Sequence, residues 1–301
     1  MDEHGYLEEF LHHERASGKA EPTLRNHRRA LKIAFEWLRA HGRTEADTTA
    51  ADLVGFVNTL VGRCVPDHVN QYVSAIRLYF RWLKQEELCP TDPATRLKFL
   101  HAPAKPVDSL TEAECKKLVR WATTEAPRKR FGVYRSAVLA MLLLDTGMRI
   151  GEALRLTLPD IDMLTGKILV RSTKTKDFRV VPLSPFLRKH LRRYLKRRDD
   201  KLTELGLKSD RIFIAESGGE LNSDLNQHAF PYVGKAAGIR RVHPHLLRHT
   251  FATQSLLNGA PLPAVMRLGG WRKLSTVQRY TYMNDEVAAQ VHAQTSPLSR
   301  L

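Results

Sequence analysis

A proline-containing segment about one third of the way along the chain divides it into two parts. The segment His101-Ala-Pro-Ala-Lys-Pro-Val-Asp-Ser-Leu110 contains two prolines and several small residues. Because a residue that precedes proline avoids helical backbone angles, such a segment is extended and suits a linker. A chain of 301 residues is long enough to bury a core on each side of it. The sequence therefore predicts two domains, residues 1–101 and 111–301, joined by a linker at 102–110.

The first domain has the periodicity of amphipathic helices. Apolar side chains recur every three or four residues in two stretches, and the first stretch begins near Pro22 and ends at Gly42. The aromatic residues of these stretches are predicted to be core. The apolar stripes are Leu24, Leu31, Ala34, Phe35 and Leu38, then Val69, Val73, Ile76, Phe80 and Leu83.

The one clear β pattern lies in the second domain. Residues 167–172 and 178–183 are rich in branched residues and flank a polar tip at 173–177, as in a β-hairpin. A basic helix is predicted at 186–201, whose charges suit a solvated face as well as a nucleic-acid surface. The rest reads as helices, the first of which opens with a capping box in Ser109-Leu-Thr-Glu-Ala-Glu114. The predicted fold class is mainly α with a small antiparallel β-sheet.

Composition restricts the class of protein. The hydrophobic content of 43% and charged content of 27% are those of a globular protein. The longest apolar run, Ala137–Leu144, is far shorter than the roughly 18 residues of a membrane span. Cys64, Cys89 and Cys115 show no metal-binding or redox spacing, so we interpret them as reduced thiols. With no secretory signal near Met1, we expect a cytoplasmic protein without a membrane partner.

The net charge of +16 is unevenly distributed. Residues 1–105 carry about +1, and residues 106–301 carry the remaining +15 or so. An excess of this size favours a polyanionic partner, of which nucleic acid is the most common. The alternative is a basic protein with solvated lysines.

Cations and hydrogen-bond donors recur along the second domain. Arginine holds two phosphate oxygens in a fixed fork, and together such donors suit a phosphodiester passing to a more negative transition state. Tyr280 follows them with an oxygen nucleophile. The donors are Arg149 in Asp145-Thr-Gly-Met-Arg-Ile-Gly-Glu152, Lys174 in Ser172-Thr-Lys-Thr-Lys176, His245 and Arg248 in His245-Leu-Leu-Arg-His249, and Trp271.

The histidines around Arg248 also allow a metal site to be considered. His245 and His249 are four residues apart on a helix predicted to start at Pro244, and His243 is near. The zinc-protease pattern requires glutamate after the first histidine, and Leu246 stands there. We therefore expect no metal here. The sequence also has no Walker loop and no clustered acidic metal ligands, so we expect no cofactor.

This set of residues, in this order, resembles the tyrosine recombinases, the family of lambda integrase, Xer and Cre, over nearly the whole chain. The strongest local match is His245-Leu-Leu-Arg-His-Thr-Phe-Ala-Thr253. Two positions depart from the pattern. Trp271 stands where most Xer-like members have histidine and Cre has tryptophan. At residues 269–270 a Leu-Gly pair is usual, and here Gly269 takes the place of the leucine.

The resemblance implies a role for each catalytic candidate. Arg149, His245 and Arg248 would bind the scissile phosphate, with Glu152 orienting Arg149, and Tyr280 rather than Tyr282 would attack it. Lys174 would protonate the departing 5′ oxygen, with Lys176 as the reserve candidate. Trp271 would donate a hydrogen bond but could not shuttle a proton.

The resemblance also implies the architecture and the reaction. A helical, SAM-like core-binding domain and a mixed α/β catalytic domain would clamp the duplex. Strands would exchange through a 3′-phosphotyrosyl link and a Holliday junction. The working form would be a tetramer on paired specific sites, made of this chain alone or of this chain and a second recombinase. The C-terminal segment at 287–293 would dock on a neighbouring subunit or fold back on its own domain. Apart from the resemblance, Arg25, Arg28, Arg29, Arg77 and Arg81 lie off the apolar stripes, where they suit DNA phosphates and ordinary solvated charge equally. The other DNA-binding candidates are Lys176, Arg272 and Lys273.

Two other functions remain open on sequence alone. A type IB topoisomerase shares this chemistry but reseals the same strand. A non-catalytic DNA-binding regulator could keep the fold, although it would have no need of Tyr280.

Overall fold

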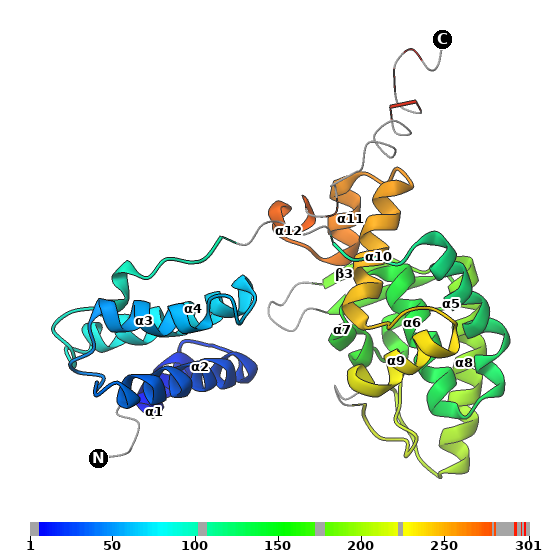
Figure 1. Cartoon of the computed structure of the whole chain (residues 1–301). Coiled ribbons are helices and arrows are strands. Elements are labelled where there is room, and N and C mark those ends of the chain that lie inside the picture. The colour runs from blue at the N-terminus through cyan, green and yellow to red at the C-terminus, as the bar shows by residue number, and fades with distance from the viewer. Residues whose placement is uncertain are drawn as a thin grey trace. The chain divides into compact units, whose positions relative to one another are not determined.

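The computed structural model describes residues 6–101, 107–171, 178–221, 225–278 and 280, with four further single residues near the C-terminus. The chain forms two compact units, Met1–Ala104 and Lys105–Leu301 (Figure 1). Residues 102–106 of the predicted linker lie outside the described residues. No helix in the described part of the chain is both long and apolar enough to cross a membrane.

The first unit is a helical bundle. The two longest helices, α2 and α4, both carry a proline in the first turn, where its missing N–H has no intrahelical partner to lose. The predicted stripes on both helices are buried throughout, which confirms the amphipathic interpretation. Its elements are α1 (Leu7–Ala16), α2 (Glu21–Ala40), α3 (Ala50–Leu60), α4 (Pro66–Gln85) and the 3₁₀ turn η1 (Pro93–Arg96).

Aromatic side chains form the centre of this first core. Tyr79 is fully buried, packs edge-on against Phe10 and Phe80, and donates a hydrogen bond to Glu45. The predicted core role of Phe80 is thereby confirmed. Burial of this phenol, whose hydroxyl is satisfied by a carboxylate, combines apolar contact with a paired polar group.

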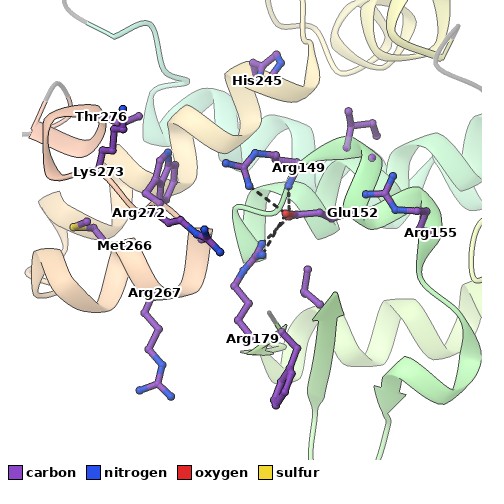
Figure 2. Close-up of a pocket in the computed structure, with 16 residues that line it drawn as sticks. Arg149, Glu152, Arg155, Arg179, His245, Met266, Arg267, Arg272, Lys273 and Thr276 are labelled. Atoms are coloured by element: carbon purple, nitrogen blue, oxygen red, sulfur yellow. Dashed lines mark hydrogen bonds and ion pairs between the residues drawn. The ribbon is translucent and has the colours of Figure 1, made fainter. Parts of the chain in front are cut away.

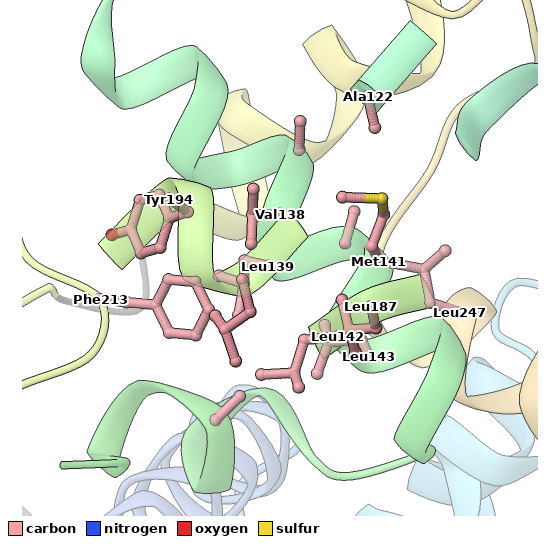
Figure 3. Packing of buried hydrophobic residues seen from close by; sticks show 14 of the residues in the cluster. Ala122, Val138, Leu139, Met141, Leu142, Leu143, Leu187, Tyr194, Phe213 and Leu247 are labelled. Atoms are coloured by element: carbon pink, nitrogen blue, oxygen red, sulfur yellow. The ribbon is translucent and has the colours of Figure 1, made fainter. Parts of the chain in front are cut away.

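The second unit is built around one helix that is apolar on all sides. This helix, α6 (Phe131–Thr146), contacts α5, α8, α9 and α10, and its leucines lie at the middle of the core (Figure 3). The other helices are α5 (Glu112–Thr124), α7 (Ile150–Arg155), α8 (Pro185–Glu204), α9 (Leu225–Ala236), α10 (Pro244–Leu257), α11 (Leu262–Gly269) and α12 (Leu274–Gln278), with 3₁₀ turns η2 (Ala126–Arg128) and η3 (Leu158–Asp160).

A three-stranded antiparallel sheet accompanies these helices. Strands β2 (Lys167–Arg171) and β3 (Phe178–Pro182) pair with Ile168 opposite Val181, which confirms the predicted hairpin. The sequence missed β1 (Ile161–Asp162), because two residues carry no readable alternation. The fold is therefore mainly α with a small antiparallel sheet, as predicted. The hairpin tip, residues 172–177, lies outside the described residues.

The basic helix differs from the prediction at one arginine. We counted Arg198 among the charges of a solvated or DNA-facing surface, but its side chain is only 1% exposed. Its three guanidinium nitrogens donate to the Arg211 and Ser209 carbonyls and to Asp199. Arg198 is therefore a structural residue of the core.

Candidate active site

Three segments of the second unit bring most of the catalytic candidates together. Arg149 follows the turn after α6, His245 and Arg248 lie on α10, and Trp271 follows α11. A cavity of about 700 Å³ opens between them, lined by Arg149, His245 and Trp271 (Figure 2). Arg248 and Tyr280 do not line this cavity, and both contact the Trp271 ring instead.

The turn that positions Arg149 requires a glycine. Helix α6 ends at Gly147, whose φ of +61° is in the left-handed region. A Cβ there would lie 2.1 Å from the Phe251 ring, so no side chain fits. Arg149 then caps the N-terminus of α7 with its guanidinium about half exposed toward the cavity. This location suits an anion, since the free N–H groups of a helix start also attract negative charge.

Glu152 holds Arg149 in position through hydrogen bonds. Its buried carboxylate accepts from the Arg149 backbone N–H at 2.9 Å and from Arg149 Nη1 at 3.2 Å. It also accepts two bonds from Arg179, at 3.2 and 2.7 Å (Figure 2). Burial by itself would raise the pKa of Glu152, but the hydrogen bonds from Arg179 and Arg149 hold it below its ordinary value. The carboxylate therefore stays ionised and keeps both guanidiniums in place.

Arg179 is a site residue that the sequence analysis missed. It lies on β3, directly after the hairpin tip, and its Nε donates to the Leu268 carbonyl at 2.8 Å. A Cβ on Gly270 would lie 2.9 Å from its guanidinium carbon, so glycine allows this close approach. Arg179 thus joins the hairpin to Glu152 and to the end of α11. Strand alternation places it on the same face as buried Val181, which was the available signal.

Arg248 is buried with an incomplete set of partners. Its Nη1 donates to the carbonyls of Gly147 and Gly269, and its guanidinium lies 3.9 Å from the centroid of the Trp271 ring. Its Nη2 is buried and has no hydrogen-bond partner among the described residues. Burial, and then the charge of Arg149, lower the pKa of Arg248 to about 10, so it remains a cation at neutral pH. A buried cation with a spare donor suits an anionic ligand.

Tyr280 is buried behind the tryptophan. Its ring packs edge-on against Trp271 with centroids 5.6 Å apart, in a small apolar cluster that includes Phe251 and Val277. Its hydroxyl lies 2.7 Å from Nδ1 of His249. From the sequence His249 is a candidate only as a metal ligand, whereas the structure places it against the candidate nucleophile. Among the described residues, no three acidic, histidine or cysteine side chains are grouped to hold a metal ion.

The two departures from the family pattern have one explanation. A Cβ on Gly269 would lie 1.8 Å from the Trp271 ring, far inside van der Waals contact. The indole therefore occupies the space that a leucine at position 269 would need. Glycine at 269 and tryptophan at 271 form a matched pair.

The remaining candidates differ in their surroundings. Arg272 and Lys273 are exposed beside the cavity, and Arg25, Arg29 and Arg81 are exposed on the first unit. Two further arginines of that unit already have protein partners. Arg28 pairs with Glu8 at 2.6 Å, and Arg77 donates to the Leu97 carbonyl at 3.0 Å. Lys174, Lys176 and Tyr282 lie outside the described residues.

Comparison with known proteins identifies the family. Residues 108–286 match the phage integrase family, and residues 7–87 match the SAM-like N-terminal domain of phage integrases. The chain is 31% identical to tyrosine recombinase XerC of Oceanobacillus iheyensis, over 97% of this chain and 96% of the relative. It is 29% identical to tyrosine recombinase XerD of Ralstonia nicotianae, over 93% and 90% of the two chains.

Solved structures show the same fold. The XerA recombinase is 25% identical with a TM-score of 0.53, covering 97% of this chain and 98% of that one. The XerH site-specific recombinase bound to a palindromic difH substrate is 20% identical with a TM-score of 0.76, covering 93% and 82%. The chain belongs to the phage integrase family. Within that family it is an Xer-like tyrosine recombinase.

Proposed function

We propose that this protein cleaves and rejoins DNA strands at a specific site through a covalent phosphotyrosyl intermediate. The observation that carries the proposal is the convergence of Arg149, His245, Arg248 and Trp271 next to buried Tyr280. The family assignment supports the same reaction. Neither a topoisomerase nor a non-catalytic regulator gains support from the comparisons.

The chemistry follows from the roles of these groups. The Tyr280 oxygen attacks the scissile phosphorus, and the bond from phosphorus to the 5′ oxygen breaks. Arg149, Arg248 and His245 donate to the phosphate oxygens as negative charge develops. Lys174, with Lys176 as the reserve candidate, protonates the departing oxygen, and Trp271 supplies one N–H. A 5′-hydroxyl then attacks the phosphotyrosyl link, so the energy of the phosphodiester is conserved without a cofactor.

DNA is the partner that the charge supports. About +15 of the net charge of +16 lies in residues 106–301, and many phosphate contacts would make binding steeply dependent on salt. Residues 1–101 would act as the core-binding domain and residues 111–301 as the catalytic domain. Strand exchange between two sites requires four active sites, so the working form would be a tetramer on paired sites, in the cytoplasm.

The nucleophile provides the decisive test. Tyr280→Phe should bind site DNA normally and form no covalent adduct with a nicked suicide substrate, because only the phenolic oxygen is lost. Tyr282→Phe is the matched control and should still form the adduct. The measurement is the protein–DNA band on a denaturing gel. An adduct with Tyr280→Phe, together with none from Tyr282→Phe, would reassign the nucleophile.

A further inference from the structure

His249 occupies a position from which it can exchange a proton with the nucleophile. It lies on α10 one turn after His245, so both rings are on the same side of the helix, with centroids 6.4 Å apart. The His249 and Tyr280 rings have centroids 5.5 Å apart, and Nδ1 is 2.7 Å from the phenolic oxygen. A distance of 2.7 Å is that of a normal hydrogen bond.

We propose that His249 is the general base that takes the proton of Tyr280 during cleavage and the general acid that returns it during rejoining. The proposal rests on the proposed function, in which Tyr280 is the nucleophile. It divides the two histidines of α10 by role. His245 lines the cavity and serves the phosphate, whereas His249 contacts the phenol.

The surroundings of Tyr280 explain why a base is needed and why His249 supplies it. A phenol with a pKa near 10 is protonated at neutral pH and is a weak nucleophile. Tyr280 is only 7% exposed, so bulk water has little access to its hydroxyl. Two polar groups close to Tyr280, the Trp271 indole and the Arg248 guanidinium, are donors only. An imidazole has one acceptor nitrogen in its neutral form.

The proton can be followed through both half-reactions. In cleavage the Tyr280 O–H proton passes to Nδ1 of His249, and the phenolate oxygen bonds to phosphorus. The electron pair of the breaking bond leaves with the 5′ oxygen, which takes a proton from Lys174. In rejoining a 5′-hydroxyl gives its proton to the now neutral Lys174 and attacks phosphorus. The bond from phosphorus to the Tyr280 oxygen breaks, and the His249 imidazolium returns its proton to that oxygen. The positive charge of Arg248 interacts with Tyr280 and stabilises the developing phenolate.

The first experiment separates proton transfer from positioning. The amide oxygen of His249→Asn can accept the Tyr280 hydrogen bond but cannot take the proton, whereas His249→Phe retains only the ring. Both variants should bind site DNA like the parent protein. Both should form the covalent adduct with the suicide substrate about a hundredfold more slowly, the usual contribution of a general base. A parental rate for His249→Asn would overturn the proposal.

The second experiment tests the acid role and controls for misfolding. A DNA strand ending in a 3′-p-nitrophenyl phosphate mimics the phosphotyrosyl link, but its leaving phenol is acidic enough to depart without a proton. In a Tyr280→Phe background, His249→Asn should join this strand to a 5′-hydroxyl at an unchanged rate. Arg248→Ala should fail in the same assay, because the phosphate still needs its donors.

The outcomes distinguish this inference from the proposed function. Equal losses by His249→Asn in the cleavage and p-nitrophenyl assays would show a general structural defect and overturn the role. Loss in cleavage alone supports it. An adduct formed by Tyr280→Phe would reassign the nucleophile and overturn the role of His249, whereas the absence of any adduct from the parent protein would overturn the proposed function itself.

Discussion

Two buried arginines of the second unit differ in one respect, which is whether their donors are satisfied. Arg198 on α8 is 1% exposed, and each of its guanidinium nitrogens donates to a carbonyl or carboxylate. Arg248 on α10 is 5% exposed, yet its Nη2 has no partner among the described residues. Because burying a cation without a partner is costly, the completed partners of Arg198 indicate a structural role. The spare donor of Arg248, next to the cavity residue Trp271, indicates a site for an anionic ligand. Burial alone does not separate the two roles.

The largest effect is expected at Arg248. Arg248→Met should slow covalent cleavage by about a hundredfold to a thousandfold, the scale for removal of a transition-state donor. Single-turnover adduct formation measures it. Arg198→Met is the matched control, and its folded fraction should cleave at the parental rate. Similar cleavage by both variants would remove the distinction between the two arginines.

For the free energy of unfolding the opposite order is expected, with the larger loss at Arg198. Arg198→Met leaves the Arg211 and Ser209 carbonyls without their partner and should cost roughly 3 kcal/mol of unfolding free energy. Arg248→Met should cost less, because the loss of its carbonyl contacts is offset by removing a desolvated cation. Urea denaturation of both variants tests the order. A larger loss for Arg248→Met would contradict it.

A smaller effect is expected where a guanidinium acts through other residues. Arg179→Lys cannot reach Glu152 and the Leu268 carbonyl together, so Arg149 and the turn at Gly270 should shift. Cleavage should fall by about tenfold, or ~1.4 kcal/mol in the barrier. Arg171→Lys is the matched control on the same hairpin, since the Arg171 side chain is largely exposed and a lysine can keep its ion pair with Asp160. Unequal DNA binding by the two variants would indicate a different role for Arg179.

Sequence reasoning succeeded where the signal is local or where the family pattern supplies it. The stripes of α2 and α4 and the β2–β3 hairpin follow from spacing alone. The catalytic roles came from the order of residues matched to the family, and they remain predictions to be tested by the variants above. What spacing could not supply were contacts between distant segments.

Arg179, His249 and Arg198 show why such contacts escape a sequence. Arg179 contacts Glu152 on α7 and Leu268 on α11, which are 27 and 89 residues away in the sequence. His249 contacts Tyr280, which follows α12. Arg198 was misassigned because its neighbours along the helix are basic and exposed. Its spacing from Leu191, Tyr194 and Leu202 nonetheless places it on the buried stripe. A charge on an apolar stripe is a useful signal that was overlooked.

The close packing of Gly269 against Trp271 has a consequence for how this active site can change over time. A leucine at 269 is blocked while the indole is present, and a histidine at 271 would leave a space where the larger ring now packs. Each single replacement is therefore expected to lower the stability of the protein, whereas replacing both residues together conserves the packed volume. Exchange between the tryptophan and histidine versions of this site therefore requires positions 269 and 271 to change together.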